Sequence, residues 1–302
     1  MHSRADLDGR PIVVIGDLMT DVVTRVDHPL AIGSDTAAQV RTRQGGAGGN
    51  VAAWVAAVRQ PVLFVGKVGD DPFGREAVEV LAAAGVRTQV AVDPLAATGT
   101  CVVLVGRDGE RTMLPDAGAN SRLEPADLPL AELREASWLH VSGYTLLNPG
   151  SRAAGLAGLR AARDAGVPMS VDASSAAPLE AVGADVFRSL TEGVDLLFCT
   201  LDEADVLCGS RDPAVVCARL TAHYPQVVLK LGAAGAMWCS AESTCHVPSV
   251  PPSGPVIDVT GAGDAFAAGV LVSTLRREGR EQALRKGCAL AASLVTREAA
   301  RP

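Results

Sequence analysis

The chain has 302 residues, 48% of them hydrophobic, and a formal net charge of −7. A chain of this length can bury a sizeable core, and its negative charge argues against a nucleic-acid or anionic-membrane surface, because both partners would be repelled. We therefore expect a globular protein with a small-molecule ligand, with no nucleic acid and no membrane among its partners.

The N-terminal stretch MHSRADLDGRP is polar and charged, and no run approaches the roughly 18 uninterrupted apolar residues of a membrane span. The seven cysteines are an odd number, and none forms a C-x-x-C pair. We therefore expect that the protein is neither exported nor anchored and that it is located in the reducing cytoplasm. We expect its cysteines to be free and to pack as small hydrophobic residues in the core.

Short apolar runs recur along the chain, with Ala-rich segments between most of them. The runs are residues 12–15, 62–65, 138–141, 169–172, 194–198 and 227–231. They are continuous rather than alternating, which is typical of strands buried on both faces of a parallel sheet. Ser151 and residues 70–72 can cap two of the helical segments, which close at Gly166 and Gly85. The alternation predicts a mostly parallel sheet covered by helices.

Two stretches break this pattern. Residues 22–43 mix β-branched and charged residues, and residues 100–115 read as two strand-like runs joined through Asp108-Gly109, a hairpin signal. Together they predict a small antiparallel sheet that stands off the main one. The Pro-rich segment 249–255 is expected to be a loop rather than a domain boundary.

The stretch DVTGAGDAF, residues 258–266, places a glycine turn and an acid before an apolar helical run. A helix N-terminus attracts anions, and Gly261 and Gly263 would let a phosphate approach its N–H groups closely. Asp264 would repel that phosphate unless it faces an incoming hydroxyl group, so the pattern favours a general base beside an anion hole. The alternative is that Asp264 only stabilises the helix start and the glycines only form a turn.

A second glycine cluster, QGGAGGN, precedes a helix that is apolar nearly all round. Its backbone can approach a ligand, and Asn50 can both donate and accept hydrogen bonds. The cluster does not follow directly on a strand, and no G-x-x-x-x-G-K-[ST] run exists, so neither a dinucleotide fingerprint nor a P-loop is indicated. The alternative is a flexible turn before a buried helix.

Three acids complete the set of candidates. Asp17 and Asp21 follow the first predicted strand, where open α/β sheets place their ligands, and they could hold sugar hydroxyl groups or cap turns. Glu203 at a predicted helix start could orient a hydrated Mg²⁺ or be a solvated first-turn acid. The five histidines show no metal-ligand spacing.

Five motifs, in order, resemble those of the ribokinase-like, or PfkB-type, family of carbohydrate kinases. They are QGGAGGN, VGKVGDDPFG (65–74), TGTCVVLVGRDGERT (98–112), VVLKLGAAGA (227–236) and DVTGAGDAFAAG (258–269). The resemblance implies a single kinase domain over residues 1–302 with a three-layer α/β/α core and a small antiparallel β-lid, formed by approximately 22–43 and 98–116. It also implies transfer of the ATP γ-phosphate to a sugar or nucleoside hydroxyl group, with Mg²⁺ and, in many members, a monovalent cation such as K⁺.

The resemblance assigns roles by motif. It implies that Asp264 is the base and that the anion hole is formed by Gly261, Ala262 and Gly263. The acceptor pocket would contain Asp21, Gly45, Gly46 and Asn50, and the residues near the nucleotide would be Lys230, Gly232 and Thr260. Glu203 would hold Mg²⁺ through water, and Asp258 with Thr260 would start the monovalent-cation site.

The chain departs from the family pattern at four places. The N-x-x-E signature reads Thr200-Leu201-Asp202-Glu203, and the segment VTREAARP lacks the usual glycine after VTR. Met19 stands where ribokinase has a polar sugar contact, and no matching acid lies around Gly143-Tyr144. The first departure concerns the positioning of the metal and the second the monovalent-cation site, whereas the last two argue against ribose as the acceptor. Our hypothesis is a small sugar that is phosphorylated on a primary hydroxyl group.

Two alternatives for function stay open. A nucleoside acceptor would need an aromatic stacking partner, for which Tyr144 and Trp138 are candidates, although the 3% aromatic content favours a plain sugar. A non-catalytic sugar- or nucleotide-binding regulator would fit the altered T-x-x-E. The lid could also pair two chains into a homodimer, or its edge could be blunted by the arginines at 25, 41 and 43.

Overall fold

A computed structural model describes residues 9–107, 110–297 and 299–302. Its main sheet has nine strands in these ranges, in the order β13-β12-β11-β10-β9-β8-β1-β4-β5. They are β1 Ile12–Ile15, β4 Val62–Gly69, β5 Arg87–Asp93, β8 Trp138–Ser142, β9 Met169–Asp172, β10 Leu196–Thr200, β11 Gln226–Lys230, β12 Ala236–Ser240 and β13 Thr244–Val247. All pairs from β11 to β5 are parallel, and β12 and β13 add an antiparallel edge. The predicted mostly parallel sheet is confirmed.

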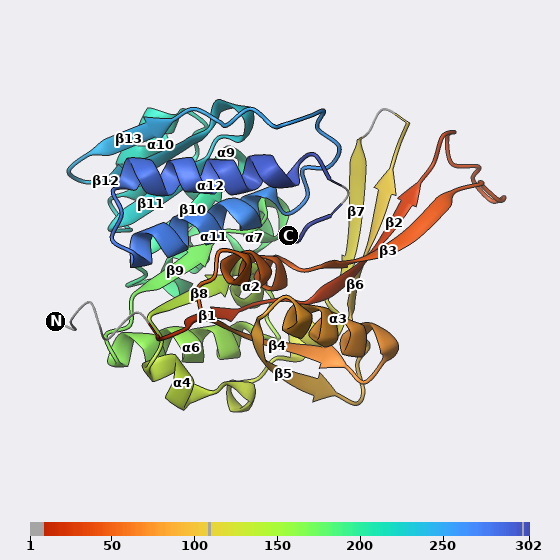
Figure 1. Cartoon of the computed structure of the whole chain (residues 1–302), viewed down its shortest axis with the longest axis horizontal. Coiled ribbons are helices and arrows are strands. Elements are labelled where there is room, and N and C mark those ends of the chain that lie inside the picture. The colour runs from red at the N-terminus through yellow and green to blue at the C-terminus, as the bar shows by residue number, and fades with distance from the viewer. Residues whose placement is uncertain (1–8, 108–109, 298) are drawn as a thin grey trace.

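Helices cover both faces of this sheet (Figure 1). The longer ones are α2 Ala47–Ala57, α3 Pro72–Ala83, α6 Arg152–Asp164, α9 Leu201–Cys208, α10 Pro213–Leu220, α11 Ala262–Leu275 and α12 Arg280–Leu294; the shorter ones are α4 Leu130–Arg134, α5 Gly143–Leu147, α7 Ala176–Val182, α8 Ala184–Leu190, η1 Gly118–Arg122, η2 Pro125–Asp127 and η3 Gly232–Ala234. None of the helices described is both long and apolar enough to span a bilayer.

Two apolar cores lie on opposite faces of the sheet, as the alternation of side chains along β1 shows. Val13 and Ile15 pack with the helices α4 to α10, whereas Ile12 and Val14 pack with α2, α3, α11 and α12. Successive side chains of a strand point to opposite faces, so a run buried on both faces must be apolar throughout. This is the predicted three-layer α/β/α arrangement.

The two predicted helix caps differ in outcome. Asp71 caps α3, because its Oδ1 accepts a hydrogen bond of 2.8 Å from the N–H of Gly74. Ser151 stands at the N-cap of α6, but its side chain makes no capping hydrogen bond. Its hydroxyl group donates to the carbonyl oxygen of Thr145 at 3.0 Å instead, so the predicted cap is wrong and the hydroxyl ties α6 to α5.

A second, four-stranded sheet forms the lid, which projects from one side of the main body (Figure 1). Its strands are β2 Met19–Arg25, β3 Gln39–Gly45, β6 Gly99–Val105 and β7 Arg111–Asp116, in the order β3-β2-β6-β7. The outer pairs are antiparallel, as expected, whereas the central pair β2 and β6 is parallel. The predicted Asp108-Gly109 turn lies outside the described residues.

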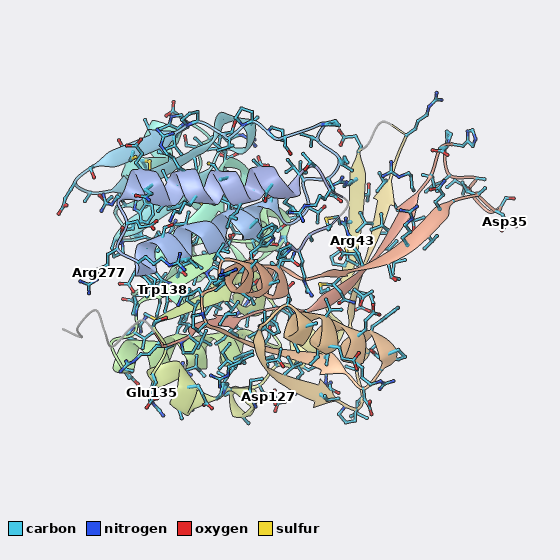
Figure 2. The ribbon with its side chains drawn as sticks, viewed as in Figure 1. Asp35, Arg43, Asp127, Glu135, Trp138 and Arg277 are labelled. Carbon is cyan, nitrogen blue, oxygen red and sulfur yellow. A yellow bond between two sulfur atoms is a disulfide. The ribbon has the colours of Figure 1, made fainter. Side chains whose placement is uncertain are left out.

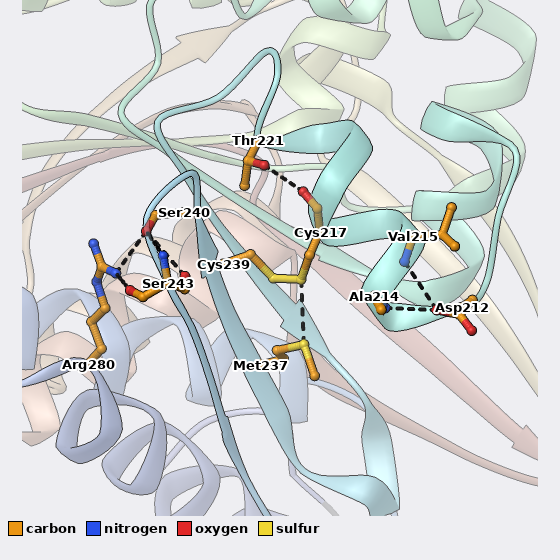
Figure 3. The surroundings of a disulfide bond; sticks show 10 residues. All are labelled: Asp212, Ala214, Val215, Cys217, Thr221, Met237, Cys239, Ser240, Ser243 and Arg280. Carbon is orange, nitrogen blue, oxygen red and sulfur yellow. Dashed lines mark hydrogen bonds between the residues drawn. A yellow bond between two sulfur atoms is a disulfide. The ribbon is translucent and has the colours of Figure 1, made fainter.

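One pair of cysteines is bonded, contrary to the expectation that all seven are free. Cys217 on α10 and Cys239 on β12 form a disulfide with their Cα atoms 5.5 Å apart, beside the sulfur of Met237 (Figure 3). The pair is 22 positions apart in sequence, and the packing of α10 against the β11–β12 hairpin brings it together. Sequence spacing alone does not define such a pairing.

The disulfide predicts the number of titratable thiols. Because five of the seven cysteines are free, a thiol titration of the denatured, unreduced protein should count five thiol groups. After reduction it should count seven. A Cys217→Ser variant should show six before reduction, because it frees Cys239. Seven thiols in the unreduced wild-type protein would contradict the bond.

Candidate functional site

The candidate site lies where the parallel strands of the main sheet end. Asp172 ends β9, Thr200 ends β10 and Lys230 ends β11, with Thr200 directly opposite Lys230 in the strand register. In an open α/β sheet, the carboxyl ends of the strands form the edge at which ligands bind. Residues from distant parts of the chain therefore meet here.

The turn before α11 has the geometry expected of a glycine turn. Gly261, at the N-cap, has a φ of +79°, and the helix has no side-chain cap. A Cβ at this position would lie 2.8 Å from the carbonyl oxygen of Ala300, so the site accepts only glycine. The N–H of Ala262 donates to the carbonyl oxygen of Val259 at 3.1 Å and is thus already used within the turn.

Asp264 lies in the first turn of α11 and is half-buried. Its Oδ2 accepts a hydrogen bond of 2.8 Å from Nδ2 of Asn50. Burial raises the pKa of Asp264 to about 7; the Asn50 hydrogen bond and Lys230 oppose this change, whereas Asp172 and Asp17 add to it. A carboxylate with a pKa near neutrality can take and release a proton under physiological conditions.

Arg301 holds the amide of Asn50 in this orientation. Its Nε donates to Oδ1 of Asn50 at 3.1 Å, and its Nη2 donates to the carbonyl oxygen of Gly45 at 2.7 Å. Since Oδ1 accepts from the guanidinium group, Nδ2 is the end of the amide that faces Asp264. Burial lowers the pKa of Arg301 to about 10, so the group stays charged at neutral pH.

Sequence reasoning missed Arg301, and no local signal marks it. The chain end lies beside α2 and the base of the lid (Figure 1), and Arg301 reaches a residue 251 positions away. Its Nη1 is buried and has no hydrogen-bond partner within the described ranges. Only the packing of the chain end against α2 makes Arg301 part of the site.

Gly45 and Gly46 allow the chain to pass close to the carboxylate of Asp21 and to the backbone of Asp17. A Cβ at Gly45 would lie 2.5 Å from Oδ1 of Asp21, and a Cβ at Gly46 would lie 2.6 Å from the carbonyl oxygen of Asp17. Gly46 also has a φ of +91°. Side chains at these positions would therefore displace Asp21 or the turn that opens α2.

Asp17 and Asp21 have different surroundings. The carboxylate of Asp17 accepts hydrogen bonds from the N–H groups of Ala47 and Gly48 and from the hydroxyl group of Ser142, so Asp17 caps α2. Asp21 is buried and accepts from Nε of Arg43 at 3.2 Å. Burial raises the pKa of Asp21, and Arg43 opposes that change.

Lys230 lies between the strand ends and the start of α11. Its Nζ contacts both carboxylate oxygens of Asp172, at 2.9 and 2.7 Å, and lies 3.5 Å from where a Cβ on Gly263 would stand. Burial would lower the pKa of Lys230, but Asp172 and Glu203 outweigh it and hold the pKa above its ordinary value. Gly232, in η3, has open space around it.

Glu203 forms a reciprocal cap with Thr200 at the start of α9. Its Oε2 accepts from the N–H of Thr200 at 2.8 Å, and Oγ1 of Thr200 accepts from the N–H of Glu203 at 3.3 Å. Thr200, which replaces the expected Asn, thus preserves the local helix start. Burial raises the pKa of Glu203.

The donors of this region fit a loosely held Mg²⁺. Glu203 supplies carboxylate oxygens, the ligands that Mg²⁺ prefers, whereas both oxygens of Asp172 contact Lys230. The described residues contain no cluster of three or more acidic, histidine or cysteine side chains placed to hold a metal by themselves. That donor set suits an ion that keeps several waters and binds substrate phosphates.

The predicted nucleotide and cation residues meet the lid. The N–H of Thr260 donates to Oδ1 of Asp258 at 2.7 Å, and the Thr260 hydroxyl group accepts from Arg111 on β7 at 3.0 Å. Arg43 and Arg111 both contact the carboxylate of Asp258. Of the predicted nucleotide residues, Lys230 therefore lies by Gly263, whereas Thr260 faces the lid.

The two candidate stacking residues are not equivalent. Trp138 is buried, donates through Nε1 to the hydroxyl group of Ser170 at 2.9 Å, and pairs with the first residue of β1, at the opposite edge of the sheet (Figure 2). Trp138 is therefore not placed to stack on a bound base, and this candidate is withdrawn. Tyr144 is 38% exposed, and burial of its hydroxyl group and the nearby Asp17 raise its pKa.

Comparison with known proteins gives a consistent picture. The protein-family model described as pfkB family carbohydrate kinase matches residues 10–302 of this chain. A fructokinase from Klebsiella pneumoniae is 32% identical over 268 residues, covering 86% of this chain and 83% of the relative.

Solved structures share the fold. A probable sugar kinase from Rhizobium etli has a TM-score of 0.90 at 24% identity, covering 98% of this chain and 96% of its own. Ribokinase from Arabidopsis thaliana, solved with ribose and ATP, has a TM-score of 0.81 at 25% identity, covering 96% and 94%. The large, mostly parallel sheet and the small lid sheet are common to this fold.

The raised pKa of Asp264 predicts a pH-dependent cost to stability. Below its ordinary pKa of 3.8 both states are protonated, whereas above about 7 the folded state must hold the charge. Stability should therefore fall as pH rises between these values, relative to an Asp264→Asn variant. One pKa unit corresponds to about 1.36 kcal/mol, so the loss in the free energy of unfolding is at most about 4 kcal/mol.

Urea unfolding of both proteins across this pH range measures the difference. Asp164→Asn, at an exposed position on α6, is the control and should show little change. A wild-type-to-variant difference that stays constant with pH would contradict the raised pKa.

Proposed function

Because the chain belongs to the pfkB family of carbohydrate kinases, we propose that it transfers the γ-phosphate of ATP to a hydroxyl group of a small sugar, with Asp264 as the general base. The single observation that carries the proposal is the carboxylate of Asp264 at the N-terminus of α11, bonded to Asn50 and with a pKa of about 7. A primary hydroxyl group is the preferred acceptor, because it is the least hindered.

The proposed reaction is an in-line displacement. Asp264 accepts the proton of the acceptor hydroxyl group as its oxygen attacks the γ-phosphorus, and the bond from that phosphorus to the bridging oxygen of ADP breaks. The N–H groups of Gly261 and Gly263 and the positive end of α11 would stabilise the charge on the transferred phosphoryl group, whereas the N–H of Ala262 is bonded to Val259. Closure of the lid over the acceptor would exclude water.

The nucleotide would bind between η3 and the start of α11. Lys230, with Gly232, would contact its phosphates, which compete with Asp172 for the ammonium group. A bound Mg²⁺ would neutralise phosphate charge, with Glu203 holding it through water.

The acceptor pocket is proposed to contain Asp21, Gly45, Gly46 and Asn50. Arg301 would act as a positioning residue, because it fixes the amide of Asn50 that faces Asp264. Trp138 is buried at the opposite sheet edge, so a nucleoside base would lose one of its two candidate stacking partners and keep only Tyr144. This loss favours a sugar over a nucleoside.

The cellular location of the protein and its oligomeric state are also proposals. A kinase that uses ATP is expected in the cytoplasm. A homodimer through the lid is supported by exposed apolar side chains on the edge strands, Val40 on β3 and Met113 and Leu114 on β7. Light scattering would then give about twice the chain mass of 30.9 kDa.

A panel of acceptors tests the function. In the presence of ATP and Mg²⁺, ADP should be released at least about tenfold faster with one or more neutral pentoses or hexoses than with any nucleoside. Preference for a nucleoside would support the nucleoside-kinase alternative. No turnover with any acceptor would contradict the kinase proposal and favour a non-catalytic binding protein.

Asp264→Asn tests the base. We expect kcat to fall by about 10²- to 10⁴-fold with the acceptor KM little changed, because the amide keeps its hydrogen bond with Asn50 but cannot take a proton. Wild-type kcat/KM should rise as pH increases through about 7, where Asp264 ionises. Asp164→Asn should behave as wild type, and near wild-type turnover by Asp264→Asn would overturn the assignment.

A further inference from the structure

Two arginines from opposite edges of the lid converge on one buried carboxylate. Arg43 lies on β3 and Arg111 on β7, the two outer strands of the lid sheet. Nη1 of Arg43 lies 2.5 Å from Oδ2 of Asp258, and Nη1 of Arg111 lies 2.5 Å from Oδ1. Each oxygen of the carboxylate therefore has its own guanidinium partner.

Both contacts are shielded from solvent. The Asp258 side chain is 7% exposed, and those of Arg43 and Arg111 are 15% and 21% exposed. Burial would raise the pKa of Asp258, but hydrogen bonds from Arg43 and Thr260 hold it below its ordinary value. The carboxylate is thus ionised at neutral pH, and both of its oxygens accept hydrogen bonds.

The same contacts reach both sides of the site. Arg43 also donates to Asp21 in the proposed acceptor pocket, and Figure 2 labels it at the base of the lid. Arg111 also donates to the hydroxyl group of Thr260 and to the carbonyl oxygen of Ile257. Together they tie both lid edges to the loop that leads into the glycine turn of α11.

This arrangement does not fit a monovalent cation at Asp258. An ion held through Asp258 would need one of its carboxylate oxygens, and each oxygen already accepts a hydrogen bond from a guanidinium group. A further cation would also be repelled by two positive charges at hydrogen-bond distance from the same carboxylate. The surroundings of Asp258 therefore disfavour the expected K⁺ role of this residue.

We propose that Arg43 and Arg111 form a latch that binds the lid to Asp258 and orders the loop 258–261, so that the enzyme works without a monovalent cation. The latch residues are positioning residues, since they act through the loop that precedes α11. The inference rests on the proposed kinase function only for its activity measurements.

The first experiment uses the wild-type protein. With the best acceptor, kcat in potassium chloride should lie within about twofold of kcat in tetramethylammonium chloride of equal ionic strength. Potassium should also leave the melting temperature unchanged. Activation of about tenfold or more by K⁺, or a clear K⁺-specific rise in melting temperature, would overturn the proposal.

Variants of Arg111 separate charge from packing. Arg111→Gln frees Oδ1 of Asp258 from its cationic partner, so kcat should fall about tenfold at unchanged KM for ATP, and K⁺ should restore part of the rate. Arg111→Lys, which keeps the charge, should stay insensitive to K⁺, as should Arg87→Gln at an exposed position on β5. Wild-type turnover by Arg111→Gln, without any response to K⁺, would contradict the latch.

The melting measurements keep the two proposals distinguishable. If no acceptor is phosphorylated under any condition, the kinase proposal fails. The latch then still predicts that K⁺ stabilises Arg111→Gln but not the wild-type protein, and equal responses of the two proteins would refute it.

Discussion

The site depends on how buried negative charge is balanced at one edge of the sheet. The acids gathered there are Asp17, Asp21, Asp172, Glu203, Asp258 and Asp264, and the cations are Arg43, Arg111, Lys230 and Arg301. Three of the acids contact an arginine or a lysine directly, whereas Asp264 is bonded to the neutral amide of Asn50. A direct ion pair would favour its charged form and lower its pKa. Burial raises the pKa of Asp264 to about 7, and the Asn50 hydrogen bond opposes this change without bringing a formal charge to the contact, so this carboxylate can exchange a proton near neutral pH.

Close backbone packing brings the amide into reach of that carboxylate. A Cβ on Gly16 would lie 2.7 Å from the Cα of Gly48, so the residue that follows β1 and the first turn of α2 approach this closely only because both are glycine. Asn50 lies two residues further along α2, which also packs against α11. The glycines of QGGAGGN thus determine where a helix lies as well as how near a ligand can come.

Local patterns were enough to predict the layers of the fold and the candidate base. The continuous apolar runs became buried strands, because both faces of the sheet are covered. Residues that act across long separations could not be predicted in the same way: Arg301 reaches Asn50 over 251 positions, and Arg43 reaches Asp258 over 215. The parallel pairing of β2 with β6 and the Cys217–Cys239 bond likewise depend on how distant segments pack.

The chain of contacts from Arg301 through Asn50 to Asp264 also constrains how this protein can diverge. The amide has one acceptor and one donor engaged, each by a different neighbour. Replacing any one of the three residues by an apolar one leaves a polar group of its neighbour without a partner, and such losses are not additive among residues in contact. Positions 50, 264 and 301 should therefore be inherited as a set, and a change at one should be tolerated only in lineages where a second has already shifted.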